Sequence, residues 1–129
     1  FVLLSDGEWD EGSNWEALLF ASHFGLNNLT AIIDYNKLQS LTTIKETINL
    51  EPFKEKFLSF GSNFIEVDGH NHSELTDAFR KSNNSKSPSV ILCHTIKGKG
   101  VSFMENKVIW HYRSPQGKEY DKAKKELNK

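Results

Sequence analysis

The sequence has little of several features that would mark a special class of protein. Its single cysteine, Cys93, excludes an internal disulfide framework and fits a reducing, cytoplasmic environment. No apolar run approaches the roughly 20 residues that a membrane-spanning helix needs. A formal net charge of −1 gives no field of one sign that would steer a nucleic acid. We therefore expect neither a membrane nor a nucleic acid as a partner.

What the chain does contain is typical of one globular domain. Its 129 residues are 12% aromatic and 26% charged, which argues against disorder. It opens on an apolar, strand-like run at residues 1–4 instead of a methionine. A buried strand at the very start of a domain is unusual, because termini normally lie at the surface. We expect the chain to be the later part of a longer polypeptide; an edge strand with a processed start is the alternative.

Apolar runs alternate with helical spacing along most of the chain. Strands are predicted at residues 1–4, 29–33, 64–67 and 89–95, and helices at about 14–26, from 51, from 73 and from about 119. Residues 41–48 are polar and irregular, which predicts a loop with a short turn. Unbroken apolar strands that alternate with helices are typical of α/β proteins with a parallel sheet. We predict that fold class, with helices on both faces of the sheet.

In parallel sheets, ligands bind beyond the carboxyl ends of the strands. That rule points to residues 6–7, 34–38 and 97–100. Asp6 and Asn36 carry hard oxygen donors, which suit a magnesium ion that holds a ligand's phosphates. Gly7 would let the backbone approach a diphosphate closely. These residue types also dominate ordinary turns, so the pattern alone leaves both interpretations open.

Two blocks of sequence carry a family resemblance. The first consists of Ser5-Asp6-Gly7-Glu8-Trp9-Asp10-Glu11-Gly12, Trp15-Glu16-Ala17, Asn28-Leu29 and Asp34-Tyr35-Asn36-Lys37-Leu38-Gln39; the second spans residues 95–106 and closes with Trp110-His111. The first block resembles the thiamine diphosphate signature of transketolases, and the second resembles their N-terminal half, especially in transketolases split into two subunits. The resemblance implies that residues 1–115 are the C-terminal part of the diphosphate-binding domain, incomplete at its N-terminus, and that residues 116–129 are a polar helix or tail.

The resemblance also implies a set of site residues. The predicted cofactor-binding residues are Asp6, Gly7, Glu8, Asn36, Leu38 and Lys97; the metal ligands are Asp6, Asn36 and the Leu38 carbonyl; the catalytic residues are Glu11 and His111. The Gly7 N–H would contact the diphosphate, and Lys97 would offset its charge. Glu11 would belong to an acidic network that links paired active sites. His111 would move a proton or donate a hydrogen bond to the substrate.

The activity implied by the resemblance is transfer of a two-carbon ketol unit from a ketose phosphate to an aldose acceptor. The cofactors would be thiamine diphosphate and Mg²⁺, with Ca²⁺ or Mn²⁺ as possible substitutes. A pyrimidine domain, as a separate subunit or a later domain, would complete a homodimer or heterotetramer. Three alternatives stay open: another thiamine diphosphate enzyme such as deoxyxylulose phosphate synthase, a non-catalytic assembly subunit that keeps the fold, and a binding module for another magnesium diphosphate ligand.

Some residues depart from the family pattern or carry no expected function. Ser5 replaces a glycine, and Tyr112-Arg113 follow His111 where the family has glycine, which could narrow the substrate channel. His70 and His72 are predicted to be solvated turn residues rather than a metal pair. Cys93 is predicted to be a small buried apolar residue.

Overall fold

The computed structural model describes residues 1–128, and its centre is a sheet of four parallel strands. The strands are β1 (Val2–Ser5), β2 (Thr30–Tyr35), β3 (Asn63–Asp68) and β4 (Ser89–His94), in the order β1-β2-β4-β3. The helices are α1 (Gly12–His23), α2 (Ile44–Thr47), α3 (Phe53–Ser59), α4 (His72–Asn83) and α5 (Lys118–Leu127), with 3-10 turns η1 (Gly7–Asp10) and η2 (Val108–His111). The predicted α/β class with a parallel sheet is confirmed.

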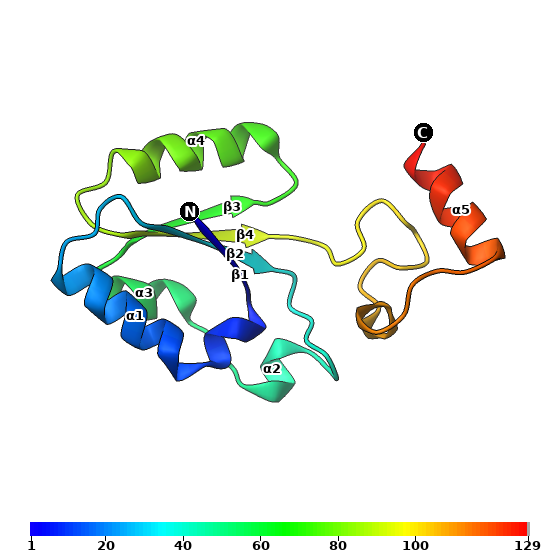
Figure 1. The fold of residues 1–129 in the computed structure, drawn as a ribbon, viewed down its shortest axis with the longest axis horizontal. Coiled ribbons are helices and arrows are strands. Elements are labelled where there is room, and N and C mark those ends of the chain that lie inside the picture. The colour runs from blue at the N-terminus through cyan, green and yellow to red at the C-terminus, as the bar shows by residue number, and fades with distance from the viewer. Residues whose placement is uncertain (129) are drawn as a thin grey trace.

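Helices cover both faces of the sheet, α1 and α3 on one side and α4 on the other (Figure 1). Strand β4 shows how the sequence builds the two cores, since successive side chains of a strand point to opposite faces. Val90 and Leu92 pack in the cluster beneath α1 and α3, whereas Ile91 and Cys93 pack in the cluster beneath α4. A strand buried on both faces must be apolar throughout, which explains the unbroken apolar run.

Two local predictions differ from the structure. The segment predicted to be a loop with a short turn, residues 41–48, contains the four-residue helix α2, whose start is fixed by a capping box between Thr43 and Glu46. The Thr43 hydroxyl accepts from the Glu46 N–H at 3.3 Å, and this Thr-x-x-Glu spacing is a recognised helix start. The helical spacing of the sequence places Leu19 on one apolar face with Trp15 and Leu18, but Leu19 is 55% exposed. Helix α1 carries apolar residues on more than one side, and its buried side carries Leu18 and Ala21.

Strand β1 lies at the edge of the sheet, where it pairs with β2. The predicted strand is therefore present, but Leu3 is 70% exposed and Val2 is 39% exposed. An edge strand has one neighbour, so its side chains lack the cover that β2 and β4 receive.

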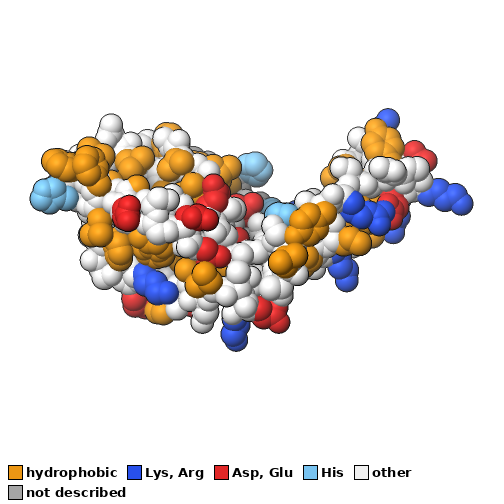
Figure 2. Space-filling view, turned by 60° about the horizontal axis from the view of Figure 1, so that its bottom comes forward, with side chains coloured by type: hydrophobic (Ala, Val, Ile, Leu, Met, Phe, Trp, Pro, Cys, Tyr) orange, Lys and Arg blue, Asp and Glu red, His pale blue; other side chains and the backbone are white. Residues whose placement is uncertain are grey.

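Residues 95–128 leave the sheet and form an arm that projects from the body of the molecule (Figures 1 and 2). Val101 and Ala123 are buried within it, and the Ser102 N–H donates to the Glu126 carboxylate at 2.6 Å. Helix α5 lies in the segment predicted to be a polar helix or tail, and Lys129 lies outside the described residues. Over residues 1–128, no helix has both the length and the apolar character needed to cross a membrane.

Candidate functional site

A pocket of about 380 Å³ opens at the carboxyl ends of β1 and β2, beside the start of the arm. All eight predicted site residues line it: Asp6, Gly7, Glu8, Glu11, Asn36, Leu38, Lys97 and His111. The sequence reasoning assigned no role to its other lining residues, which are Ser5, Asp34, Gln39 and Ser40. Residues that are far apart in the chain thus meet where the strand-end rule placed them.

Asp6 is the buried centre of the pocket, with only 1% of its surface exposed. Its Oδ1 accepts from the Gly7 N–H at 2.8 Å and its Oδ2 accepts from the Lys37 N–H at 2.7 Å. Burial raises the pKa of Asp6 to about 6; these two backbone bonds oppose the shift, and the nearby Asp34 and Asp10 carboxylates add to it. The carboxylate is held in one orientation, in surroundings that a cation would neutralise.

The turn after β2 aims Asn36 at the pocket. Lys37 adopts a left-handed backbone with φ of 68°, which directs its N–H back to Asp6. The Asn36 side chain accepts from the Leu38 N–H through Oδ1 at 3.0 Å and donates through Nδ2 to Asp34 Oδ1 at 3.4 Å. These two contacts identify which end of the amide carries the oxygen. The oxygen, a hard metal ligand, is the end that lies next to the Leu38 N–H.

The Leu38 carbonyl, predicted to be a metal ligand, lies next to this amide. Leu38 and Thr43 form an isolated antiparallel bridge. The two hydrogen bonds of that bridge, at 2.8 and 3.1 Å, join the flanking residues. The Leu38 carbonyl takes part in neither of these hydrogen bonds, so its oxygen can still bind a metal ion.

Gly7 and Glu8 follow Asp6 in the turn η1. The Gly7 N–H, predicted to contact a diphosphate, donates to Asp6 in this structure. A Cβ on Gly7 would lie 3.2 Å from the Gln39 side chain, so glycine permits this close approach. Glu8 Oε2 accepts from the Ser5 N–H at 2.6 Å and from its hydroxyl at 2.9 Å. The serine that replaces the family's glycine thus gains a partner and ends β1 in a strand conformation.

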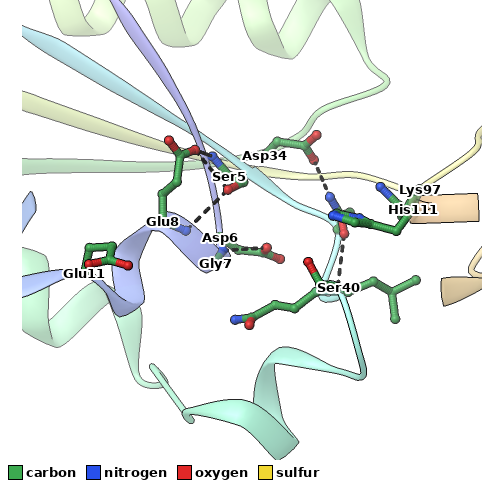
Figure 3. A pocket seen from close by; sticks show the side chains of 12 residues that line it. Ser5, Asp6, Gly7, Glu8, Glu11, Asp34, Ser40, Lys97 and His111 are labelled. Carbon is green, nitrogen blue, oxygen red and sulfur yellow. Dashed lines mark hydrogen bonds between the residues drawn. The ribbon is translucent and has the colours of Figure 1, made fainter.

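The pocket has two sides of different character, as Figure 3 shows. Glu8 and Glu11 lie on the side formed by η1, and Lys97 and His111 lie on the opposite side, with Asp6 between them. Lys97 is half-buried and comes from the first turn of the arm, whereas exposed His111 comes from η2. A ligand here would meet a carboxylate side that suits a cation and a basic side that suits an anion.

Tyr112 and Arg113, which replace the family's glycine, do not line this pocket. The Arg113 guanidinium lies 4.5 Å from the centre of the Trp110 ring and pairs with Glu119. Tyr112 is 62% exposed. Within the described chain, the two side chains do not narrow this opening.

The donor set fits a magnesium ion shared with a phosphate ligand. In the part of the chain that the structure describes, no three His, Cys, Asp or Glu side chains are arranged to hold a metal ion. The predicted set is instead one carboxylate, one amide oxygen and one backbone carbonyl, on Asp6, Asn36 and Leu38. Mg²⁺ prefers such hard oxygens and commonly completes its shell with phosphate oxygens and water. The residues present therefore suit the group that the sequence implied.

Asp34 is a residue of the pocket whose contacts the sequence does not predict. Its Oδ1 accepts from the Thr95 hydroxyl as well as from the Asn36 amide, which joins the ends of β2 and β4. The available signal is its position near the end of a strand, inside a segment that the strand-end rule marks.

Cys93, near the end of β4, is buried as predicted, and burial raises the pKa of its thiol to about 11.

Comparisons with known proteins bear on this geometry. Residues 1–128 match the family model described as "Transketolase, thiamine diphosphate binding domain". The chain is 37% identical over 129 residues to one subunit of the apulose-4-phosphate transketolase of Phocaeicola vulgatus, covering 99% of this chain and 46% of that protein. It is 42% identical over 112 residues to "6-deoxy-6-sulfo-D-fructose transketolase subunit SqwG" of a Clostridium species, covering 86% of this chain and 41% of that protein.

A solved structure agrees with the fold. The crystal structure of a transketolase from Campylobacter jejuni superposes with a TM-score of 0.89 at 28% identity, covering 98% of this chain and 20% of that chain. The chain therefore spans less than half the length of these relatives.

Proposed function

This chain belongs to the family of transketolase thiamine diphosphate-binding domains, and from that membership we propose that its pocket holds Mg²⁺ and the diphosphate of the cofactor in a transketolase-type transferase. The reaction would move a two-carbon ketol unit from an anionic ketose, such as a ketose phosphate, to an aldose acceptor. The observation that carries the proposal is the convergence of the eight predicted residues on one pocket at the carboxyl edge of the sheet.

The chain's own residues would divide the work between binding and orientation. Asp6, the Asn36 amide oxygen and the Leu38 carbonyl would hold the metal, since their positions are fixed by backbone hydrogen bonds before any ligand arrives. Lys97, on the side opposite Glu8 and Glu11, would offset negative charge of the diphosphate. The Gly7 N–H is engaged by Asp6, so its contact with the diphosphate would have to be shared with that carboxylate.

Thiamine diphosphate, when bound, supplies an electron sink that stabilises carbanion charge next to a carbonyl. His111 would hold or donate a proton at a substrate oxygen, because its imidazole lines the pocket beside Lys97 and an imidazole can both accept and donate a proton. Glu11 is exposed at the pocket edge and its carboxylate does not cap α1, so it is available to an acidic network shared with a second subunit.

An assembly with a further polypeptide, which would bring the pyrimidine domain, is part of the proposal. Helix α1 and its C-terminal cap expose Leu19, Phe20 and Phe24, and the centres of the last two rings lie 4.4 Å apart. A helix that is apolar on its outer side normally buries that side against a partner. Two relatives are named as subunits of transketolases, which supports a homodimer or a heterotetramer with a separate pyrimidine-domain subunit.

The proposal is tested in the natural full-length protein together with its partner. Isothermal titration with thiamine diphosphate, with and without Mg²⁺, is expected to show binding that depends on the metal. A ketol-transfer assay with ketose phosphates then separates the proposed enzyme from its alternatives. Metal-dependent binding without any transfer would favour a different thiamine diphosphate reaction or a non-catalytic subunit, and absence of binding would overturn the site itself.

A further inference from the structure

We propose that His70 is a positioning residue of this site: its neutral ring anchors the backbone at Ile96 and so fixes the segment that carries Lys97. His70 is exposed in a turn, as the sequence predicts, and its ring also accepts a hydrogen bond there. The inference rests on the proposed function, because it assigns His70 a role toward the Mg²⁺ and diphosphate pocket.

The key contact is a hydrogen bond from the Ile96 N–H to His70 Nε2, at 2.8 Å. A backbone N–H can only donate, so Nε2 must be the nitrogen without a proton. The ring is therefore neutral, with its proton on Nδ1. The His70 N–H donates in turn to Asp68 Oδ1 at 2.8 Å, and the Asp68 N–H donates to the Glu74 carboxylate at 2.9 Å. The turn that carries the imidazole is thus held by these two hydrogen bonds.

The residue before His70 presses the same turn against the end of β4. The Gly69 N–H donates to the His94 carbonyl at 2.8 Å. A Cβ at Gly69 would lie 2.6 Å from Thr95 Cγ2 and 3.1 Å from Cys93 Cβ. Only a residue without a side chain allows the turn to approach this closely. Residues 68–70 therefore form a clamp on residues 94–96, made by two hydrogen bonds to the backbone and one steric fit.

The clamped segment faces the pocket on its other side. The Thr95 hydroxyl donates to Asp34 Oδ1, the same oxygen that receives the Asn36 amide. Lys97, the residue after the clamped Ile96, lines the pocket, and its carbonyl accepts from the Asn106 N–H at 3.0 Å. The position of this short segment therefore affects two lining residues of the pocket, Asp34 through Thr95 and Lys97 directly.

Without the His70 bond, the Ile96 N–H loses its partner within the chain and the segment gains freedom before Lys97. Cofactor binding would then have to order the segment, which weakens affinity without removing any group that touches the ligand. The expected loss is roughly three- to tenfold, the size that one hydrogen bond to a neutral partner contributes.

The test uses four variants of the whole natural protein, assembled with its partner, and titration of thiamine diphosphate in the presence of Mg²⁺. His70→Ala is expected to weaken binding roughly three- to tenfold. His70→Gln places an amide oxygen near the position of Nε2 and is expected to stay within about twofold of the natural protein. His70→Asn, one methylene shorter, is expected to resemble His70→Ala. His72→Ala removes the histidine two residues further on and is expected to bind as the natural protein does.

The outcomes separate this inference from the proposed function. If the natural protein fails to bind the cofactor with Mg²⁺, the proposed function fails. If it binds and His70→Ala binds equally well, or Gln and Asn weaken binding to the same extent, the positioning role is wrong. Melting temperatures of the Gln and Asn variants provide the check on folding, because their polar side chains differ by one methylene. A rescue by Gln alone supports the bond to Ile96.

Discussion

The body of the molecule, up to the end of β4, and the arm of residues 95–128 contribute opposite sides of one pocket and are stabilised in different ways. Strands β2 and β4 are buried on both faces, and Asp6 and Asn36 lie at the end of this rigid sheet. The arm projects from the sheet and is held by a few polar and apolar contacts of its own. We infer that the metal side of the pocket exists before any ligand binds, whereas the basic side depends on how well the arm is fixed.

The largest effect is expected at the rigid side. Asp6→Ala removes the single buried carboxylate of the pocket, and we expect Mg²⁺-dependent cofactor affinity to fall at least about 100-fold, because a charged ligand to the metal is lost. Titration calorimetry measures it. Asp77→Ala is the matched control and should bind normally, because Asp77 lies on the exposed face of α4, where it pairs with Arg80. Near-normal binding by Asp6→Ala would remove the metal site from this edge of the sheet.

A smaller effect is expected at the arm. Lys97→Ala should weaken cofactor binding roughly tenfold and leave the melting temperature nearly unchanged, since a half-buried lysine of the arm contributes little to the core. Lys97→Arg should recover part of the affinity because it keeps the charge. The distinction between the two regions would break down if Lys97→Ala melted several degrees lower than the natural protein.

A pH series sharpens the same comparison. The pKa of Asp6 is raised from 3.8 to about 6, so the folded chain binds this proton more tightly than the unfolded chain does. Without ligands, the stabilisation from protonated Asp6 is therefore present at low pH and is lost as the pH rises from about 4 to about 6. Mg²⁺ binds the ionised form, so the rise in melting temperature on adding Mg²⁺ and cofactor should be small at about pH 5 and large at about pH 7. In Asp6→Asn this dependence should flatten; an unchanged profile would assign it to another group.

The smallest effect is expected within the arm itself. Ser102→Ala removes the hydroxyl that donates to the Glu126 carboxylate at 2.9 Å, a contact that ties the loop after β4 to α5. We expect faster amide hydrogen exchange in α5, by an amount that corresponds to about 1 kcal/mol. Exchange in β4 should not change. If β4 amides also exchanged faster, the arm and the body would be one cooperative unit.

The parts of the structure that the sequence predicted well are those governed by local pattern. Residues 89–95 are largely apolar, and the structure places β4 at the centre of the sheet. The strand-end rule, together with the family resemblance, found Asp6, Asn36 and Lys97, which do line one pocket. Their positions follow from the topology of a parallel sheet, which the alternation of strands and helices already indicates.

The parts that the sequence did not predict depend on pairs of residues far apart in the chain. Thr95 and Asp34 are 61 positions apart, and Ile96 and His70 are 26 apart, so no periodicity relates them. Leu19 was placed wrongly for a different reason: helical spacing identifies an apolar stripe, but α1 is apolar on more than one side. The capping box of α2, Thr43 with Glu46, is a local signal, but it lies within a polar stretch whose irregular spacing indicates a loop.

The only thiol of the sequence lies in the strand that holds the sheet together. Cys93 is 5% exposed, and burial raises its pKa to about 11, so a thiol reagent finds little thiolate and little access. Modification of the chain at this residue must wait until β4 separates from its neighbours. Cys93 is therefore a natural reporter of core opening: its alkylation rate measures how often β4 separates from the sheet, and no label or substitution is needed.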